Sequence, residues 1–318
     1  RWFGTTPVTF PALNRSARTR VVGSVNIVIV NYNSGDRLER ALKALRSAVV
    51  AATPRVVVTV VDNASLDTSA SRLVTVKEPT VDILSGALPV RIIFSEQNLG
   101  FAGGVNRGAR EQDADAVMIM NPDLELRSET LGALIEALER YPQLGMVSPV
   151  LVGKDGRVQH GFTARRFPSL ASTLAELFFL HRIWPRNPWT MAYRLQDDRP
   201  LRAYLERETT PLPHHDLAAP VVVDQPAGAC LLVRTETFRR LDGFDERFWP
   251  AWFEDVDFAL RARRIGALAA VVGGSRADHE GGYSLSYLSA SGFSEAWYSN
   301  LIRYWRKSGS TGEYLTLR

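Results

Sequence analysis

Two runs of β-branched residues near the start of the chain constrain its fold more than any other feature. Residues 25–32 read VNIVIVNY and residues 55–62 read RVVVTVVD. Continuous apolar runs of this length are typical of strands that are buried on both faces, as in a parallel sheet covered by helices. The start of the chain therefore predicts a sheet with helices on both sides.

Strand and helix patterns alternate four times before residue 150. Shorter strand patterns occupy residues 90–94 and 116–120, and helical patterns follow each strand. The first helix is expected at 34–50, and the second begins at Asp67. The third runs from a glycine-rich turn after the third strand to Gln112, and the fourth runs from a Ser128 cap to Arg140. This order predicts an α/β protein with a doubly wound, mostly parallel sheet.

After about residue 150 the regular alternation stops. We divide the chain into an N-terminal arm (1–24), an α/β half (25–150) and an elaborated second half (151–318). In the second half, the sequence predicts helices at 169–182 and 254–264 and an amphipathic helix within 285–307. It predicts strands within 221–233 and at 268–272, and an aromatic loop at 241–253.

Composition excludes several classes of protein. The single cysteine, Cys230, rules out a disulfide framework and a cysteine-rich metal site. No apolar run approaches the roughly 20 residues needed to span a bilayer, and the start of the chain lacks the pattern of a secretory signal. We therefore expect a cytoplasmic protein, soluble or peripheral at the inner face of the plasma membrane.

The net charge of +4 is unevenly distributed. Arginines gather in residues 1–20 and 182–207, and a basic group at 303–307 lies near the end of the chain. Such patches suit phosphates or an anionic membrane surface, although an ordinary solvated surface explains any one of them equally well. Nucleic-acid binding would depend on these patches alone, and we do not expect it.

Polar residues follow the predicted strands at the points where they end. Asn31 and Asn33 follow the first strand, Asp62 ends the second, Asn98 follows the third and Asp123 follows the fourth. Ligands of parallel sheets bind beyond the carboxyl ends of the strands. We therefore expect these side chains to form one binding site.

A glycine-rich turn with the sequence NLGFAGGVNRG occupies residues 98–108 and includes Gly100 and Asn106. Glycines at a helix N-terminus allow a ligand to approach the backbone, and the helix dipole favours an anion. The spacing is not that of the dinucleotide fingerprint. An ordinary tight turn remains the alternative.

Acidic residues supply the candidates for chemistry. Asp123 could hold a hard divalent cation, which takes carboxylate oxygens together with substrate phosphates. Glu254 and Asp255 open a helix behind aromatic residues able to stack on a sugar, where a carboxylate could act as a base. Acids in a first helical turn also simply complement the helix dipole. His279, before two glycines, could bind a metal or a phosphate, or be an ordinary surface or core histidine.

The order of these motifs resembles the inverting family 2 glycosyltransferases of the GT-A fold over roughly residues 25–305. The strings are VDNAS at 61–65, NLGF at 98–101, NPD at 121–123, GFDE at 243–246, FEDVD at 253–257 and the late His279. The sequences IWPRNPWT at 183–190 and GACLLVR at 228–234 are similar to polyprenyl-diphosphate N-acetylglucosamine rhamnosyltransferases of cell-wall linker synthesis.

The resemblance implies an enzyme that uses dTDP-L-rhamnose and a divalent cation, Mg²⁺ or Mn²⁺, and acts on a polyprenyl-diphosphate-linked sugar or another glycan. It makes Asp255 the catalytic base and Asp62 the contact to the nucleobase, while Asp123 and His279 would hold the metal and diphosphate. Asn121 stands where the family often has a first acid. The donor-binding residues expected on these grounds are Asn31, Asn33, Asp62, Asn98, Gly100, Asn106, Asn121 and Glu254.

Two alternatives remain open on the sequence, and a third is not matched by it. A UDP-sugar, for example UDP-galactofuranose, could replace the dTDP donor, because thymine and uracil differ by one methyl group. A non-catalytic sugar-nucleotide or glycan-binding module would have the same fold but should carry a damaged acidic set. A pyrophosphorylase should carry an Arg-containing, glycine-rich loop after the first strand, and residues 31–35 (NYNSG) do not match it.

Overall fold

The computed structural model describes residues 21–50, 54–75, 78–85, 88–207, 219–282 and 289–317. Its strands are β1 (Ser24–Asn31), β2 (Arg55–Asp62), β3 (Thr80–Ser85), β4 (Leu88–Phe94), β5 (Ala116–Met120), β6 (Leu124–Leu126), β7 (Leu144–Val152), β8 (Ala164–Arg165), β9 (Val221–Val223), β10 (Gln225–Pro226), β11 (Cys230–Arg234) and β12 (Leu268–His279). Its helices are α1 (Arg37–Val50), the 3₁₀ turn η1 (Ser71–Leu73), α2 (Gly100–Ala109), α3 (Thr130–Arg140), α4 (His160–Thr163), α5 (Leu170–Leu177), α6 (Leu180–Ile183), α7 (Pro188–Tyr193), α8 (Arg199–Glu206), α9 (Thr235–Arg240), α10 (Glu254–Arg264), α11 (Ala290–Ser308) and α12 (Thr311–Leu317).

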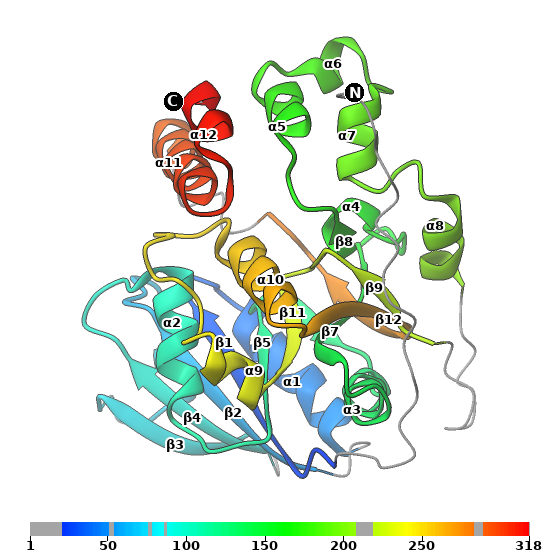
Figure 1. The fold of residues 1–318 in the computed structure, drawn as a ribbon. Helices are drawn as coiled ribbons and strands as arrows, with labels where there is room; N and C mark the ends of the chain where they lie inside the picture. The colour runs from blue at the N-terminus through cyan, green and yellow to red at the C-terminus, as the bar shows by residue number, and fades with distance from the viewer. Residues whose placement is uncertain are drawn as a thin grey trace.

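One ten-stranded sheet crosses the molecule in the order β3-β4-β2-β1-β5-β11-β7-β12-β6, with β9 beside β12 (Figure 1). β1 is parallel to both β2 and β5, and β2 is parallel to β4. β11 lies antiparallel between β5 and β7, so strands from both halves of the chain share the sheet. The expected α/β fold is confirmed.

Residues on the two faces of β1 pack into two separate hydrophobic cores. Ile27 and Ile29 belong to a cluster with residues of α1 and α3, whereas Val28 and Val30 belong to a cluster with residues of α2 and α10. α2 lies close against the strand, because a Cβ at Gly104 would come within 2.7 Å of Val30 Cγ1. This close packing holds the N-terminus of α2 near the carboxyl ends of β1 and β2.

Two helix predictions in the first half need correction. Asp67 starts no α-helix, and only the 3₁₀ turn η1 follows it. The Asp67 carboxylate accepts the backbone N–H groups of Gly35 and Ser69 and so stabilises a loop instead. Ser128 is not the cap of α3, which has Glu129 in that position; the Ser128 hydroxyl donates to the Glu129 carboxylate.

One helix of the second half is shorter than predicted. The expected helix at 169–182 is divided into α5 and α6 at Phe179, whose backbone is left-handed with φ of 51°. In Figure 1, α5, α6 and α7 stand together above the sheet, and α11 and α12 lie above α10. No helix within the described ranges is both long enough and apolar enough to cross a membrane.

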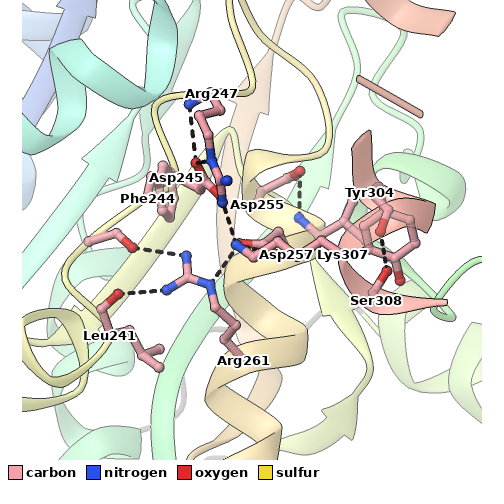
Figure 2. A network of polar contacts seen from close by, with 12 residues as sticks. Leu241, Phe244, Asp245, Arg247, Asp255, Asp257, Arg261, Tyr304, Lys307 and Ser308 are labelled. Atoms are coloured by element: carbon pink, nitrogen blue, oxygen red, sulfur yellow. Dashed lines mark hydrogen bonds and ion pairs between the residues drawn. The ribbon is translucent and has the colours of Figure 1, made fainter. Parts of the chain in front are cut away.

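A buried carboxylate joins α10 to α11. Asp257 of α10 accepts from Arg261 Nε at 2.7 Å and from Lys307 Nζ of α11 at 2.8 Å (Figure 2). Arg261 also donates to the carbonyl oxygens of Leu241 and Gly243. Asp257 therefore has structural partners on every side, and its network fixes the helix that begins with Glu254 and Asp255.

Replacing Asp257 with alanine should destabilise the protein, because the two cations would lose a buried partner. We expect a loss of about 3 kcal/mol in the free energy of unfolding, measured by urea denaturation. Asp113→Ala removes an exposed ion pair with Arg239 and should change the free energy by less than about 1 kcal/mol. Equal effects of the two variants would contradict the structural role of Asp257.

Candidate functional site

The carboxyl ends of β1 and β2 meet at a buried polar pair. Asn31 lies opposite Asp62 in the sheet register, and its Nδ2 donates to Asp62 Oδ1 at 2.7 Å and to Ser69 Oγ at 2.8 Å. Both Asn31 and Asp62 are buried. The Asp62 carboxylate is therefore held in one orientation at the edge where ligands of parallel sheets bind.

Asn33 shapes the loop beside this pair. Its backbone is left-handed, with φ of 50°, and its Oδ1 accepts the backbone N–H groups of Leu66 and Asp67 at 2.7 and 3.2 Å. The structure thus brings Asn31, Asn33 and Asp62 together, as the sequence predicts.

The glycine-rich turn is joined to the same edge through Asn63. Asn63 Nδ2 donates to Asn98 Oδ1 at 2.9 Å and to the carbonyl oxygen of Gly100 at 3.1 Å. Gly100 has φ of 73°, and a Cβ there would lie 2.7 Å from Trp249 Cδ1. Asn98 and Gly100 are therefore held beside the end of β2.

Asn106 lies deeper, inside α2. Its amide donates to the carbonyl oxygen of Phe244 and to the Glu246 carboxylate, and its Oδ1 accepts the Phe244 N–H. These contacts fix the loop after α9. The side chain of Asn106 is therefore engaged by this loop.

Asp123 and His279 form the centre of the candidate metal site. Both are buried, and His279 Nε2 lies 3.7 Å from Asp123 Oδ2. Asp123 Oδ2 accepts the N–H of Gly281, whereas Asp123 Oδ1 is buried without a hydrogen-bond partner among the described residues. Asn121 is half-buried two residues earlier, and its N–H donates to the carbonyl oxygen of Ala229.

Gln159 orients the histidine. Its Oε1 lies 2.7 Å from His279 Nδ1, and its Nε2 donates to the His279 carbonyl oxygen. Because an amide oxygen only accepts, the pairing places the proton on Nδ1 and leaves the lone pair of Nε2 toward Asp123. A second group that fixes the tautomer in this way is typical of metal-binding histidines.

Burial disfavours the charged form of both Asp123 and His279. It raises the pKa of Asp123, an effect opposed by the neighbouring His279, and it lowers the pKa of His279, an effect opposed by Asp123. A neutral imidazole and an unsatisfied carboxylate oxygen are the donor set that a divalent cation would use. No third His, Cys, Asp or Glu joins this pair within the described residues, so the pair fits a cation only if a substrate diphosphate supplies the remaining ligands.

A cavity of about 710 Å³ connects this centre with the start of α10. His279, Glu254 and Asp255 all line it, together with Trp252 and Trp297. The structure thus brings the predicted base and one predicted metal ligand into a single cavity with aromatic walls. Such cavities commonly bind organic ligands, including sugars.

Asp255 is held at the cavity wall by backbone groups and by charge. Its Oδ1 accepts the N–H of Val256 at 2.8 Å, and a Cβ at Gly228 would come within 2.5 Å of its Oδ2. Burial raises the pKa of Asp255, and the Val256 N–H and the positive charge of Arg165 act in the opposite direction.

Glu254 is more deeply buried than Asp255. Its Oε2 has no hydrogen-bond partner within the described ranges. Burial first, and then the charge of Asp255, raises its pKa well above the ordinary value. A carboxyl group in this state can retain its proton and donate to a ligand oxygen.

Two residues in the cavity were missed by the sequence analysis. Gln159 lies in a loop after β7 and has no motif around it, so only its contact with His279 identifies it. Arg165 follows α4, and its guanidinium lies 5.6 Å from the Phe162 ring centroid and 5.8 Å from that of Tyr193. Its position beside Asp255 becomes visible only in three dimensions.

Comparisons with known proteins identify the family of the chain. Residues 26–198 match the sequence profile of glycosyl transferase family 2. The chain is 33% identical over 270 residues to the N-acetylglucosaminyl-diphospho-decaprenol L-rhamnosyltransferase of Mycobacterium tuberculosis, covering 81% of this chain and 76% of that protein. It is also 24% identical to the rhamnosyltransferase WbbL of Escherichia coli K12, over 54% of this chain and 55% of that one.

Solved structures show the same fold at low sequence identity. GalNAc-T7 with UDP, GalNAc and Mn²⁺ superposes with a TM-score of 0.57 at 15% identity, over 90% of this chain and 48% of that one. The mannosyltransferase PcManGT of Pyrobaculum calidifontis, in complex with GDP-Man and Mn²⁺, superposes with a TM-score of 0.51 at 16% identity, over 93% and 66%. The chain is therefore a glycosyltransferase that belongs to glycosyl transferase family 2 and has the GT-A fold.

Proposed function

We propose that this enzyme transfers L-rhamnose from dTDP-L-rhamnose, with inversion, to a hydroxyl of a polyprenyl-diphosphate-linked sugar at the inner face of the plasma membrane. The observation that carries the proposal is the shared cavity of Asp255 and His279, with Asp123 directly behind the histidine. In this arrangement a base lies on the acceptor side and the expected diphosphate-binding pair lies on the donor side.

The choice of sugar and acceptor is supported by the relatives. The M. tuberculosis relative is named for rhamnosyl transfer to a decaprenol-linked N-acetylglucosamine, and the E. coli relative is named as a rhamnosyltransferase. In our proposal Asp62 accepts from the imide N–H of thymine, and Asn31 keeps its carboxylate in place.

A diphosphate-bearing acceptor is also supported by the cationic side chains of the cavity. Arg165 has no carboxylate within ion-pair distance among the described residues, and its Nε donates to the carbonyl oxygen of Gly161. Arg194, on the same wall, is already paired with Glu176 at 2.9 Å. Arg165 is therefore the cation that an acceptor phosphate would meet in this cavity.

The chemistry assigned to this chain is the transfer of one proton. Asp255 takes the proton of the acceptor hydroxyl as that oxygen forms a bond to the anomeric carbon, while the bond to the donor diphosphate breaks. The anomeric carbon acquires oxocarbenium character during this displacement, as in glycosidases. Glu254 is proposed to keep its proton and to donate to a hydroxyl of the donor sugar.

Asp123 and His279 are the residues that would hold a divalent cation, Mg²⁺ or Mn²⁺. When bound, such a cation supplies Lewis-acid stabilisation of the leaving diphosphate. Gln159 maintains the tautomer that His279 needs for this role.

The donor is tested by transfer assays with a panel of nucleotide sugars and a polyprenyl-diphosphate N-acetylglucosamine acceptor. We expect transfer from dTDP-L-rhamnose in the presence of Mg²⁺ or Mn²⁺, and loss of transfer after chelation. Comparable or faster transfer from UDP-galactofuranose would instead favour the UDP-sugar alternative.

Asp255→Asn should lower the rate of transfer by about 10²–10⁴-fold, because the amide cannot accept the proton. Donor affinity should remain near that of the wild type, since the side chain keeps its shape. Burial raises the pKa of Asp255 above its ordinary value of 3.8, so the wild-type rate should rise with pH through the shifted value as the carboxylate forms. Near-wild-type turnover of the variant would refute the assignment.

Asp123→Ala should weaken metal-dependent donor binding by more than about tenfold, measured by calorimetry with the donor nucleotide in the presence of Mn²⁺. Asp278→Ala is the matched control. Asp278 precedes His279 but pairs with Arg127, and its side chain is half exposed. Unchanged affinity of the Asp123 variant, or equal losses in both variants, would count against the metal site.

A further inference from the structure

An exposed apolar cluster lies at the end of α5 and through α6. Phe178, Phe179, Ile183 and Trp184 are 70%, 48%, 80% and 51% exposed. They fall within seven consecutive residues, and we call them the α5–α6 tip. Isolated exposed apolar side chains are common on protein surfaces, whereas contiguous groups of large ones mark interaction sites.

The tip has a defined conformation. Asn187 Nδ2 donates to the carbonyl oxygen of Trp184, and Asn187 Oδ1 accepts the Thr190 N–H at the start of α7. The Trp184 ring contacts the Trp189 ring edge-to-face at 6.0 Å. The Asn187 cap therefore fixes the backbone at Trp184, and Trp189 packs against its ring, so this part of the tip is ordered before a partner binds.

The charges around the tip are positive. No acidic residue occurs between Leu177 and Gln196, and this stretch contains Arg182 and Arg186. Both arginines are exposed and have no carboxylate partner among the described residues. Arg182 lies over the Phe179 ring at 5.0 Å. Aromatic and aliphatic groups interleaved with arginines suit the interface of an anionic bilayer, where rings bury at the headgroup level and each cation adds attraction.

The tip is also next to the cavity. Ser172, Thr173 and Glu176 of α5 line the cavity wall, and Phe178 is the C-cap residue of the same helix. We infer that the α5–α6 tip docks on an anionic membrane surface and thereby presents the cavity to the lipid-linked acceptor. This inference rests on the proposed function only for the nature of the acceptor.

Vesicle sedimentation tests the inference with a matched pair of variants. Wild-type protein should bind vesicles of phosphatidylcholine containing phosphatidylglycerol and should bind phosphatidylcholine alone more weakly. Ile183→Asp should weaken binding to the anionic vesicles by about tenfold or more. Val21→Asp changes another exposed aliphatic residue, 71% exposed, and should bind as the wild type does.

Combined Arg182→Gln and Arg186→Gln should lower binding to anionic vesicles by about tenfold or more, toward the level on neutral vesicles.

Absence of wild-type binding to anionic vesicles would overturn the inference, as would equal effects of Ile183→Asp and Val21→Asp. Sedimentation velocity without lipid gives a further check. If the chain dimerises and Ile183→Asp makes it monomeric, a second copy covers the tip and the membrane inference fails. Because vesicle binding needs neither donor nor acceptor, intact binding without rhamnosyl transfer would overturn the proposed function alone. Rhamnosyl transfer by a protein that does not bind the vesicles would overturn the membrane inference and leave the proposed function intact.

Discussion

The amide of Asn300 holds the turn that leads into α10 and the cavity wall. This side chain of α11 is buried, and it donates to the carbonyl oxygens of Trp249 and Ala251 at 3.1 and 2.8 Å. The next two residues, Trp252 and Phe253, are both left-handed, with φ of 75° and 73°. Each such residue costs on the order of 1–3 kcal/mol, so the turn persists only because α11 stabilises it.

The position of Glu254 and Asp255, the carboxylates of the proposed reaction, follows from this turn. α10 begins at Glu254 directly after the two left-handed residues, and Phe253 packs against Trp297 and Tyr304 of α11. Backbone strain of this kind concentrates at functional sites, where it fixes a side chain that a relaxed loop would not. Here Glu254 and Asp255 line the cavity, whereas Asp257 pairs with Arg261 and Lys307.

Much of the proposed donor side could be predicted from the sequence. Hydrophobic periodicity identifies the strands, and the residues at their ends identify the polar groups of the site. The buried runs identify β1, β2 and β5, and a parallel sheet necessarily brings Asn31 and Asp62 to one edge. β7 was missed although all of it is buried, because Gly145 and Pro149 interrupt its apolar pattern. α10 was predicted with its observed bounds, since acids open it and arginines close it.

The rest of the site depends on contacts that cross long sequence distances. Gln159 reaches His279 across 120 residues, and no local pattern identifies such a partner. β12 was predicted to end at residue 272, but it continues past an irregularity to His279 and so carries the histidine to Asp123. Asp257 lies two residues after Asp255 in the string FEDVD, and its two cationic partners, Arg261 and Lys307, show its structural role.

In the proposed function, the sheet edge and the cavity wall have different roles, and their architectures differ accordingly. The strand-end groups lie on a sheet whose neighbours are fixed by backbone hydrogen bonds, so their spacing tolerates little change. The cavity wall combines the short helices α4, α5 and α7 with β10 and residues of α10 and α11, and its loops can vary more readily than the strands of the sheet. In the proposed reaction the sheet edge binds the nucleotide part of the donor, and the short helices select the acceptor. Asp255 and His279 lie where the two surfaces meet, so an in-line displacement can occur between a rigid donor site and an acceptor site that evolution can remodel.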